Sequence, residues 1–372
     1  MAEPASASSG ERLPEIVGVV GAGTMGAGIG QVALEAGCEV VLFDVDEAAV
    51  AAGRRRISDG LERRAAKLGL DQDGTDEWVR SRLERVRDAP TVDGLADEAD
   101  LVIESAMEDL GLKRTIFRTL DEVAGPDVML ATNTSALSVA EIAEATRRPD
   151  RVIGLHFFNP APIMALVEVV APPLADPAVV ARAVATITAW GKTPVVCADR
   201  PGFIVNRVNR PFTIEALRIL ESGAATVTEI DEALRDGGFP MGPFELMDLT
   251  GIDVTLAAAT GVWDGLGRPD RLRPSPIQEA LVAAGDLGRK TGEGFYRYAD
   301  GARVGENERA PKPAPDEHLG AAQIRDRILD SIANEARLAA NEGVASPELI
   351  DLAVRLGAGH PHGPFESRQR PT

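Results

Sequence analysis

The chain has 372 residues, a formal net charge of −19 and two cysteines, Cys38 and Cys197. Its length allows two or three domains, and its acidic excess argues against nucleic acid as a partner, because the phosphate backbone attracts basic surfaces. Two cysteines cannot build a disulfide framework, and no apolar run reaches the roughly 18–20 residues that cross a bilayer, so we expect a cytoplasmic protein without a membrane partner.

The chain begins with a small polar stretch, residues 1–14, that we expect to be a disordered tail and not a secretory signal. An apolar strand at 16–20 follows and runs directly into the glycine-rich turn GAGTMG at 21–26. After a helical pattern, a second apolar strand at 40–43 ends at Asp44. Strand, glycine turn, helix, strand and acid in this order are typical of a dinucleotide-binding βαβ unit.

The three glycines of this turn have different expected roles. Gly21 allows the tight turn, Gly23 lets the backbone approach a pyrophosphate, and Gly26 lets the helix pack closely on the strand. The helix that starts at Thr24 and Met25 offers unsatisfied N–H groups to the phosphates. We therefore expect the cofactor phosphates to lie on this turn.

Asp44 bears on the choice of cofactor. Its carboxylate would accept hydrogen bonds from the adenosine ribose hydroxyls and repel a 2′-phosphate. The residues that follow, Val45 and Asp46, supply no arginine to neutralise such a phosphate. The sequence therefore predicts NAD and not NADP.

Residues 47–88 are expected to form two charged helices, the first of which carries a basic cluster. Most such clusters are solvated helix faces, but in so acidic a chain this one is also a candidate site for the phosphates of an anionic ligand. Both interpretations stay open at this point. The cluster consists of Arg54, Arg55, Arg56, Arg63, Arg64 and Lys67.

Alternating strand and helix patterns continue to residue 199 and predict a doubly wound (Rossmann) α/β sheet over 15–199. From Arg200 onward the patterns are helical and predict an all-α domain over 200–302; its expected roles in substrate binding and dimerisation come from the family resemblance given below. The stretch 303–320, rich in proline, glycine and charge, is expected to be a linker. The elements expected in the first domain after residue 88 are strands at 101–103, 128–130, 152–155, 167–170 and 194–197 and helices at 110–124 and 177–190.

Residues 321–372 are expected to be a partial second copy of the helical domain. Several helical positions recur 120 residues later, and the closing P-x-G-P-F-E of the first copy recurs after a one-residue slip. Shared helical composition explains some of these matches but not the closing motif. The recurring pairs include Arg207 and Arg327, Glu215 and Glu335, Asp231 and Asp351, and Pro240 and Pro361.

His156 and Glu168 are the main candidates for chemistry. His156 ends a strand on the side of the sheet where the cofactor is expected, and Glu168 lies inside an otherwise apolar strand. A buried carboxylate is costly unless it is paired, so the two are expected to pair. Such a pair can provide the base that removes a hydroxyl proton as hydride leaves, or it can be purely structural. Taken alone, Ser135 and Asn206 would be helix-capping or loop residues.

The order and spacing of several motifs identify a family. ATNTSALS, HFFNP, DRPGFIVNR, GGFPMGPFELMDLTGIDV and GRKTGEGFY lie in a stretch from Ile16 to about Tyr298 that resembles the 3-hydroxyacyl-CoA dehydrogenases, including bacterial 3-hydroxybutyryl-CoA dehydrogenases. The resemblance implies NAD-dependent oxidation of a 3-hydroxyacyl-CoA to a 3-oxoacyl-CoA, with a short acyl chain expected. It implies that His156 is the catalytic base, that Glu168 is its partner, and that Ser135 and Asn206 hold the 3-oxygen and the acyl carbonyl.

The same resemblance assigns further binding residues. Lys67 matches a CoA-contacting lysine, whereas Gly60 replaces a CoA-contacting serine of some relatives, which puts one CoA contact in doubt. No metal is expected. The positions that match NAD contacts, beyond the glycine turn and Asp44, are Glu108, Lys113, Asn159 and Lys290.

Two alternatives and the assembly stay open. A dehydrogenase of a small hydroxy acid without CoA, resembling L-gulonate or carnitine dehydrogenases, would share His156 and Glu168 but would not need the basic cluster around Lys67. A non-catalytic NAD-binding protein would need none of them. A homodimer is favoured slightly over a pseudo-dimeric monomer, in which the partial repeat takes the place of a partner subunit. The acyl chain length, and whether the acyl group carries a second carboxylate, are not fixed by the sequence.

Overall fold

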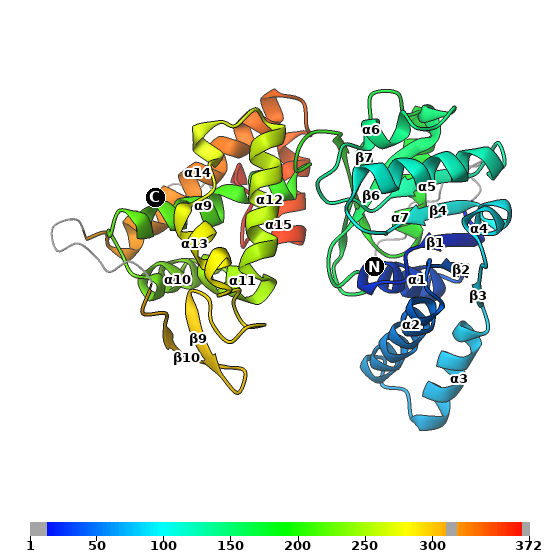
Figure 1. Cartoon of the computed structure of the whole chain (residues 1–372), viewed down its shortest axis with the longest axis horizontal. Helices are drawn as coiled ribbons and strands as arrows, with labels where there is room; N and C mark the ends of the chain where they lie inside the picture. Colours follow the sequence, from blue (N-terminus) through cyan, green and yellow to red (C-terminus); the bar gives the residue numbers. More distant parts are fainter. Residues whose placement is uncertain (1–12, 310–317, 367–372) are drawn as a thin grey trace, which may run out of the picture. The chain divides into compact units, whose positions relative to one another are not determined.

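The computed structural model describes residues 13–309 and 318–366 and divides into two units, Met1–Asp199 and Arg200–Thr372 (Figure 1). Most of the expected tail at 1–14 lies outside the described residues. Within the described part of the chain, no helix is long and apolar enough to cross a membrane. Cys38 and Cys197 are both buried and free.

The first unit is built on an eight-stranded sheet with the strand order β3-β2-β1-β4-β5-β6-β7-β8. Neighbouring strands run parallel except β6 and β7, which are antiparallel because a short loop and no crossover helix joins them. The doubly wound fold is confirmed, with its last two strands reversed. The strands are β1 (Ile16–Val20), β2 (Glu39–Phe43), β3 (Val86–Asp88), β4 (Leu101–Glu104), β5 (Met129–Thr132), β6 (Val152–Phe157), β7 (Leu166–Ala171) and β8 (Thr193–Ala198).

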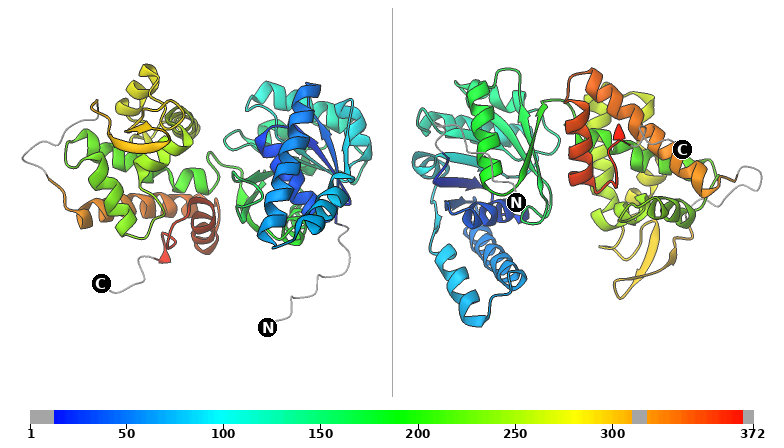
Figure 2. Two further views of the ribbon diagram at one scale, coloured as in Figure 1. Left: turned by 90° about the horizontal axis from the view of Figure 1, so that it is seen from below. Right: turned by 180° about the vertical axis from the view of Figure 1, so that it is seen from behind.

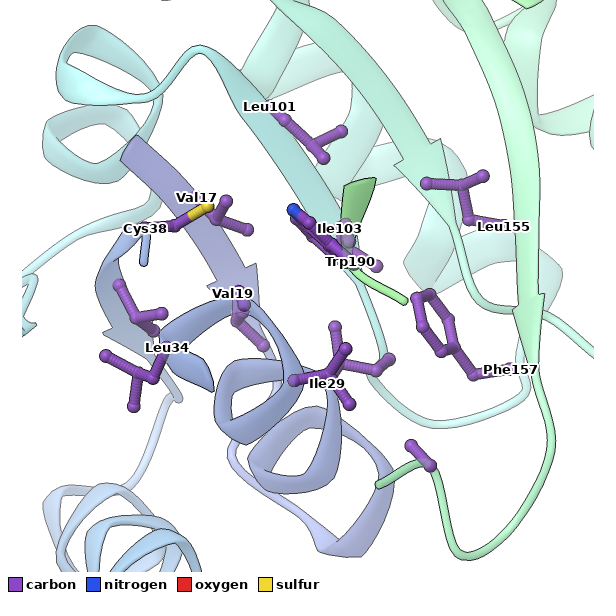
Figure 3. Packing of buried hydrophobic residues seen from close by; sticks show 14 of the residues in the cluster. Val17, Val19, Ile29, Leu34, Cys38, Leu101, Ile103, Leu155, Phe157 and Trp190 are labelled. Carbon is purple, nitrogen blue, oxygen red and sulfur yellow. The ribbon is translucent and has the colours of Figure 1, made fainter. Parts of the chain in front are cut away.

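Helices cover both faces of this sheet. On one face Val19, Ile29 and Phe157 belong to a single buried apolar cluster, in which side chains of α1 meet the sheet (Figure 3). Gly18 points to the opposite face, where a Cβ would lie 2.4 Å from Cδ2 of Leu95 in α4. The helices are α1 (Thr24–Glu35), α2 (Glu47–Lys67), α3 (Gln72–Leu83), α4 (Val92–Glu98), α5 (Leu110–Val123), α6 (Val139–Ala143), α7 (Pro177–Ala189) and the 3₁₀ turn Pro149–Arg151.

Two of these elements differ from the sequence-based expectation. Strand β3 lies where the charged region 47–88 was expected to be helical, and α4 was not predicted. β3 has three residues, two of them exposed and charged, so it gives no apolar pattern from which a strand could be recognised.

The second unit is mainly helical. After Arg200 it contains six helices, one β-hairpin and then two further helices, together with the 3₁₀ turn Asp270–Leu272, within the described residues. These are α8 (Val205–Val208), α9 (Arg210–Glu221), α10 (Val227–Asp236), α11 (Pro243–Thr250), α12 (Ile252–Gly265), α13 (Pro276–Ala284), β9 (Tyr296–Ala299), β10 (Ala302–Glu306), α14 (Ala321–Asn341) and α15 (Pro347–Ala358).

The hairpin corrects the expectation of a wholly helical domain that ends at 302. Asp300 and Gly301 form its turn with φ angles of 49° and 76°, as two-residue hairpin turns require. Glu306 then accepts a hydrogen bond from the backbone N–H of Thr228 at 2.8 Å, so β10 belongs to the helical unit and not to a linker. Residues 310–317 of the expected linker lie outside the described residues.

Helices α14 and α15 pack within the same unit, and α14 lies along α9 (Figure 2). The ion pairs that α14 forms with α8 and α9 are reciprocal. Nε of Arg207 donates to Oε1 of Glu335 at 2.8 Å, and Nε of Arg327 donates to Oε1 of Glu215 at 2.6 Å. Because residues 327 and 335 correspond to residues 207 and 215, each copy of the repeat gives the other the same contact.

The loops that follow α10 and α15 also make reciprocal contacts. A Cβ on Gly238 would lie 3.4 Å from Pro361, and a Cβ on Gly359 would lie 3.3 Å from Pro240. Gly359 and Pro361 are the repeat equivalents of Gly238 and Pro240. Reciprocal contacts of this kind are what a two-fold, isologous interface produces, and here both halves belong to one chain.

Candidate active site

The glycine turn after β1 has the geometry that a bound pyrophosphate needs. Gly21 has a φ of 102°, and its N–H donates to the carbonyl oxygen of Phe43 at 2.8 Å. A Cβ on Gly26 would lie 1.8 Å from the carbonyl oxygen of Gly21, whereas a Cβ on Gly23 would have no heavy atom within 4 Å. Gly26 is therefore required by packing, and Gly23 leaves open space above the turn.

The start of α1 is open to an anion. Gly23 is the N-cap residue and forms no side-chain capping bond, and the first turn, which begins with Thr24 and Met25, contains no acidic residue. Oδ2 of Asp44, at the end of β2, accepts a hydrogen bond from the N–H of Ala22 at 2.8 Å. The residues therefore fit a dinucleotide, with helix N–H groups for the phosphates and a carboxylate beside the turn for a ribose.

His156 and Glu168 form a buried pair. They are direct partners in the register of β6 and β7, and His156 Nδ1 lies 2.6 Å from Glu168 Oε2. His156 is 5% exposed and Glu168 is completely buried. Because a carboxylate can only accept, Nδ1–H donates to Glu168 and the ring lone pair lies on Nε2. The expected pairing of these two residues is present in the structure.

Ser135 lies in a loop after β5 that Glu108 holds in place. Oε1 of Glu108 accepts hydrogen bonds from Thr134 Oγ1 at 2.6 Å, from the N–H of Ser135 at 2.9 Å and from Ser135 Oγ at 3.3 Å. Burial opposes ionisation of Glu108, but the bond from Thr134 and the charge of Lys113 hold the pKa of this carboxyl below its usual range. The sequence predicts NAD contacts for Glu108 and Lys113; what the structure shows for Glu108 is that it fixes the Ser135 loop.

Lys113 is itself a buried support of this loop. It is 1% exposed, and its Nζ lies 2.7 Å from Glu104 Oε1 and 3.4 Å from Glu108 Oε2. Glu104 ends β4 and also accepts a hydrogen bond from Thr132 Oγ1 at 2.7 Å. The loops after β4 and β5 are therefore joined by one charged network, which sequence reasoning missed because its two parts, 104–113 and 132–135, are separate in the chain.

A basic pocket lies in the same unit. It has a volume of about 470 Å³ and is bounded by α1, α2 and the loop that follows β6. Lys67 and Asn159, both exposed, line it. The other charged or polar side chains that line it are Thr24, Gln31, Arg56, Asp59, Arg63 and Arg64.

Gln31 explains the glycine at position 60. A Cβ on Gly60 would lie 2.0 Å from Oε1 of Gln31, whose Nε2 donates to Glu35 Oε1 at 2.8 Å. Gln31 therefore fills the space that a serine side chain at position 60 would need. Gln31 was not singled out from the sequence, because its role depends on the approach of α2 to α1.

The remaining expected site residues belong to the second unit. Asn206 is half-buried in α8. Nζ of Lys290 forms an ion pair with Asp253, 2.5 Å from Oδ1. Among the residues that the structure describes, no cluster of three or more His, Cys, Asp or Glu side chains could hold a metal ion.

Two family models match the chain. The model described as 3-hydroxyacyl-CoA dehydrogenase, NAD binding domain, matches residues 16–200. The model described as 3-hydroxyacyl-CoA dehydrogenase, C-terminal domain, matches residues 202–298 and 324–369 and so covers both copies of the repeat.

Individual relatives agree with these matches. The chain is 41% identical to the 3-hydroxyadipyl-CoA dehydrogenase of Escherichia coli, over 90% of this chain and 71% of that protein. It is 42% identical to a 3-hydroxybutyryl-CoA dehydrogenase of Mycobacterium tuberculosis, over 76% of this chain and 98% of that protein. The crystal structure of a 3-hydroxybutyryl-CoA dehydrogenase from Escherichia coli matches with a TM-score of 0.84 and 35% identity, covering 94% of this chain and 90% of that one. The chain therefore belongs to the 3-hydroxyacyl-CoA dehydrogenase family of NAD-binding oxidoreductases.

Proposed function

We propose that this chain catalyses the NAD-dependent oxidation of a short-chain 3-hydroxyacyl-CoA, such as 3-hydroxybutyryl-CoA, to the 3-oxoacyl-CoA, and the reverse reduction. The buried His156–Glu168 pair is the observation that carries the proposal. It lies at the same edge of the sheet as the glycine turn, because β1 and β6 end in the same direction. Ligands of doubly wound sheets bind at this edge.

The pair determines how the reaction's proton is handled. With Nδ1–H bonded to Glu168, Nε2 of His156 takes the proton of the substrate's 3-hydroxyl group. Glu168 then stabilises the imidazolium and keeps its orientation. Ser135 and Asn206 hold the 3-oxygen and the acyl carbonyl, as the family resemblance implies. The chemistry that bound NAD supplies is hydride acceptance, and the glycine turn, Asp44, Glu108, Lys113, Asn159 and Lys290 are the residues proposed to hold it.

The basic pocket supports a CoA thioester over a small hydroxy acid. A small hydroxy acid such as gulonate has one carboxylate and does not need three cationic side chains, Lys67, Arg63 and Arg64, around a pocket of about 470 Å³, whereas CoA carries several phosphates that cationic side chains bind. A location in the cytoplasm stays a prediction of the sequence.

A substrate panel tests this choice. NADH oxidation is measured with acetoacetyl-CoA, with free acetoacetate and with the ketones derived from gulonate and carnitine. Turnover of acetoacetyl-CoA at a kcat/KM at least a hundredfold above the free ketones is expected. A preference for a ketone without CoA would replace this proposal by the small-hydroxy-acid alternative.

We also infer that the partial repeat takes the place of a partner subunit. The sequence left a homodimer slightly favoured, but the reciprocal contacts of Arg207 with Glu335 and of Arg327 with Glu215 support the pseudo-dimeric monomer. In a chain without the repeat, the same symmetry would pair Arg207 of one subunit with Glu215 of the other.

Truncation tests this inference. A chain that ends at Arg309 keeps β10 and the ion pair of Arg309 with Asp286 but loses α14 and α15. Light scattering should show a monomer for the full chain and a dimer or aggregate for the truncated one, and Arg207→Glu should prevent the truncated chain from dimerising. A full chain that dimerises, with a truncated chain of unchanged state, would contradict the inference.

A further inference from the structure

Arg210, the first residue of α9, is a buried cation without a counter-charge. Arg210 is only 9% exposed, and its Nε has no hydrogen-bond partner among the described residues. Burial alone lowers the pKa of Arg210 to about 10, with no contribution from a neighbouring carboxylate. The guanidinium is still charged at neutral pH, so its position requires a physical explanation.

Two other arginines of this unit that are buried or half-buried have carboxylate partners. Arg207, which is completely buried, pairs with Glu335 and Glu342, and half-buried Arg271 pairs with Glu335. A buried charge without a partner costs several kcal/mol. The contrast indicates that the partner of Arg210 is not part of the described chain.

The repeat shows that helix packing does not require this arginine. Arg207, which contributes to packing, recurs as Arg327, but the equivalent of Arg210 is the exposed Asp330. Asn206 is replaced in the same way, by Asp326. The second copy thus keeps a residue that joins the copies and lacks both the proposed substrate ligand and Arg210.

Arg210, the first residue of α9, comes four residues after Asn206 in α8. Asn209, which links α8 to α9, has helical angles, with φ −81° and ψ −7°. Residues four apart in a helix lie on the same face about 6 Å apart along the axis. Under the proposed function, Asn206 holds the acyl group near its reacting carbon. Arg210 is then placed about one turn away, at a distance that a few methylene groups span.

We propose that Arg210 binds a second carboxylate at the far end of the acyl chain, so that the enzyme prefers CoA thioesters of dicarboxylic 3-hydroxy acids to those whose acyl chain ends in a methyl group. This inference rests on the proposed function and specifies its substrate class. A carboxylate is a suitable partner because it can accept two parallel hydrogen bonds from one guanidinium. A substrate that ends in a methyl group would leave the buried cation unpaired, which gives the site a means of discrimination.

Matched substrates separate the effect of charge from that of chain length. The reduction rates of 3-oxoadipyl-CoA and of its terminal methyl ester are compared, with acetoacetyl-CoA as the reference for basal activity. The wild-type enzyme should prefer the acid to the ester by about tenfold to a hundredfold in kcat/KM, as expected for a hydrogen-bonded charge pair. Arg210→Met should abolish this preference, and Arg210→Lys should restore part of it.

Arg218→Met is the matched control, because Arg218 lies in the same helix and already pairs with Glu215. It should leave the preference for the acid unchanged. Thermal unfolding distinguishes a binding role from a structural one: Arg210→Met should not lower the melting temperature, since it removes an unpaired buried charge. A preference for the acid that survives Arg210→Met, or equal rates with acid and ester in the wild type, would overturn the inference. Failure to reduce acetoacetyl-CoA at all would instead overturn the proposed function.

Discussion

Two substitutions that each add one methyl group test whether the glycine turn is a phosphate cradle. In Gly26→Ala the new Cβ would lie 1.8 Å from the carbonyl oxygen of Gly21, so the backbone itself must move. We expect a loss of about 3 kcal/mol of unfolding free energy or more. In Gly23→Ala the new Cβ meets no heavy atom within 4 Å, and the backbone angles of φ −66° and ψ −169° are allowed for alanine. We expect a stability change within about 0.5 kcal/mol.

The two variants should therefore fail in different ways. The methyl group of Gly23→Ala extends into the space proposed for the pyrophosphate, so the Kd for NADH should rise at least tenfold, or about 1.4 kcal/mol. Thermal unfolding and titration of NADH fluorescence measure the two effects separately. Normal NADH binding by a well-folded Gly23→Ala variant would show that the pyrophosphate does not lie on this turn.

Three further outcomes follow from single side chains. Asp44→Ala should narrow the preference for NADH over NADPH, as measured by the ratio of the two kcat/KM values; a wild-type enzyme that uses both equally would show that Asp44 does not face the ribose. Lys67→Glu should raise the KM for acetoacetyl-CoA and leave NADH binding unchanged. The control Arg118→Glu, on the exposed side of α5, should change neither quantity. An unchanged KM in Lys67→Glu would show that the basic cluster is only a solvated helix face. Burial lowers the pKa of His360 from 6.5 to about 4. Between these pH values the unfolded chain therefore binds a proton that the folded chain does not. The free energy of unfolding should fall by up to about 3 kcal/mol as the pH drops from 6.5 to 4. In denaturant titrations, His360→Gln should reduce this dependence of the unfolding free energy on pH, and the substitution of the exposed His362 by Gln should not. An equal pH dependence in the two variants would refute the role of His360.

Local patterns predicted the parts of the molecule that depend on local structure. The GAGTMG turn, the apolar strands around it and the strand positions of His156 and Glu168 were all visible as short motifs. The pairing of His156 with Glu168 also followed from one energetic rule, since a carboxylate within an apolar strand needs a partner. The hairpin at Asp300 and Gly301 could have been predicted too, because Asp-Gly between two short strands favours this turn, but the many charged residues around it suggested a linker.

Features that depend on long-range packing were not predictable in this way. Glu108 holds the Ser135 loop from 27 residues away, and nothing in its own neighbourhood indicates this role. Arg210 resembles a surface residue in sequence, because arginine is common on helix surfaces, and only the packed helices show that it is buried and unpaired. Nothing in the sequence around Gly60 indicates that Gln31 occupies the space that a larger side chain at position 60 would enter.

The most direct test of the account is the turnover of His156→Gln with acetoacetyl-CoA and NADH. The account predicts that kcat falls by roughly 10²–10⁴, while the Kd for NADH and the melting temperature stay close to those of the wild type. His318→Gln, a change of the same kind at an exposed histidine, should keep full activity. Near-normal turnover by a folded, NADH-binding His156→Gln variant would remove the His156–Glu168 pair from the mechanism and contradict the central claim.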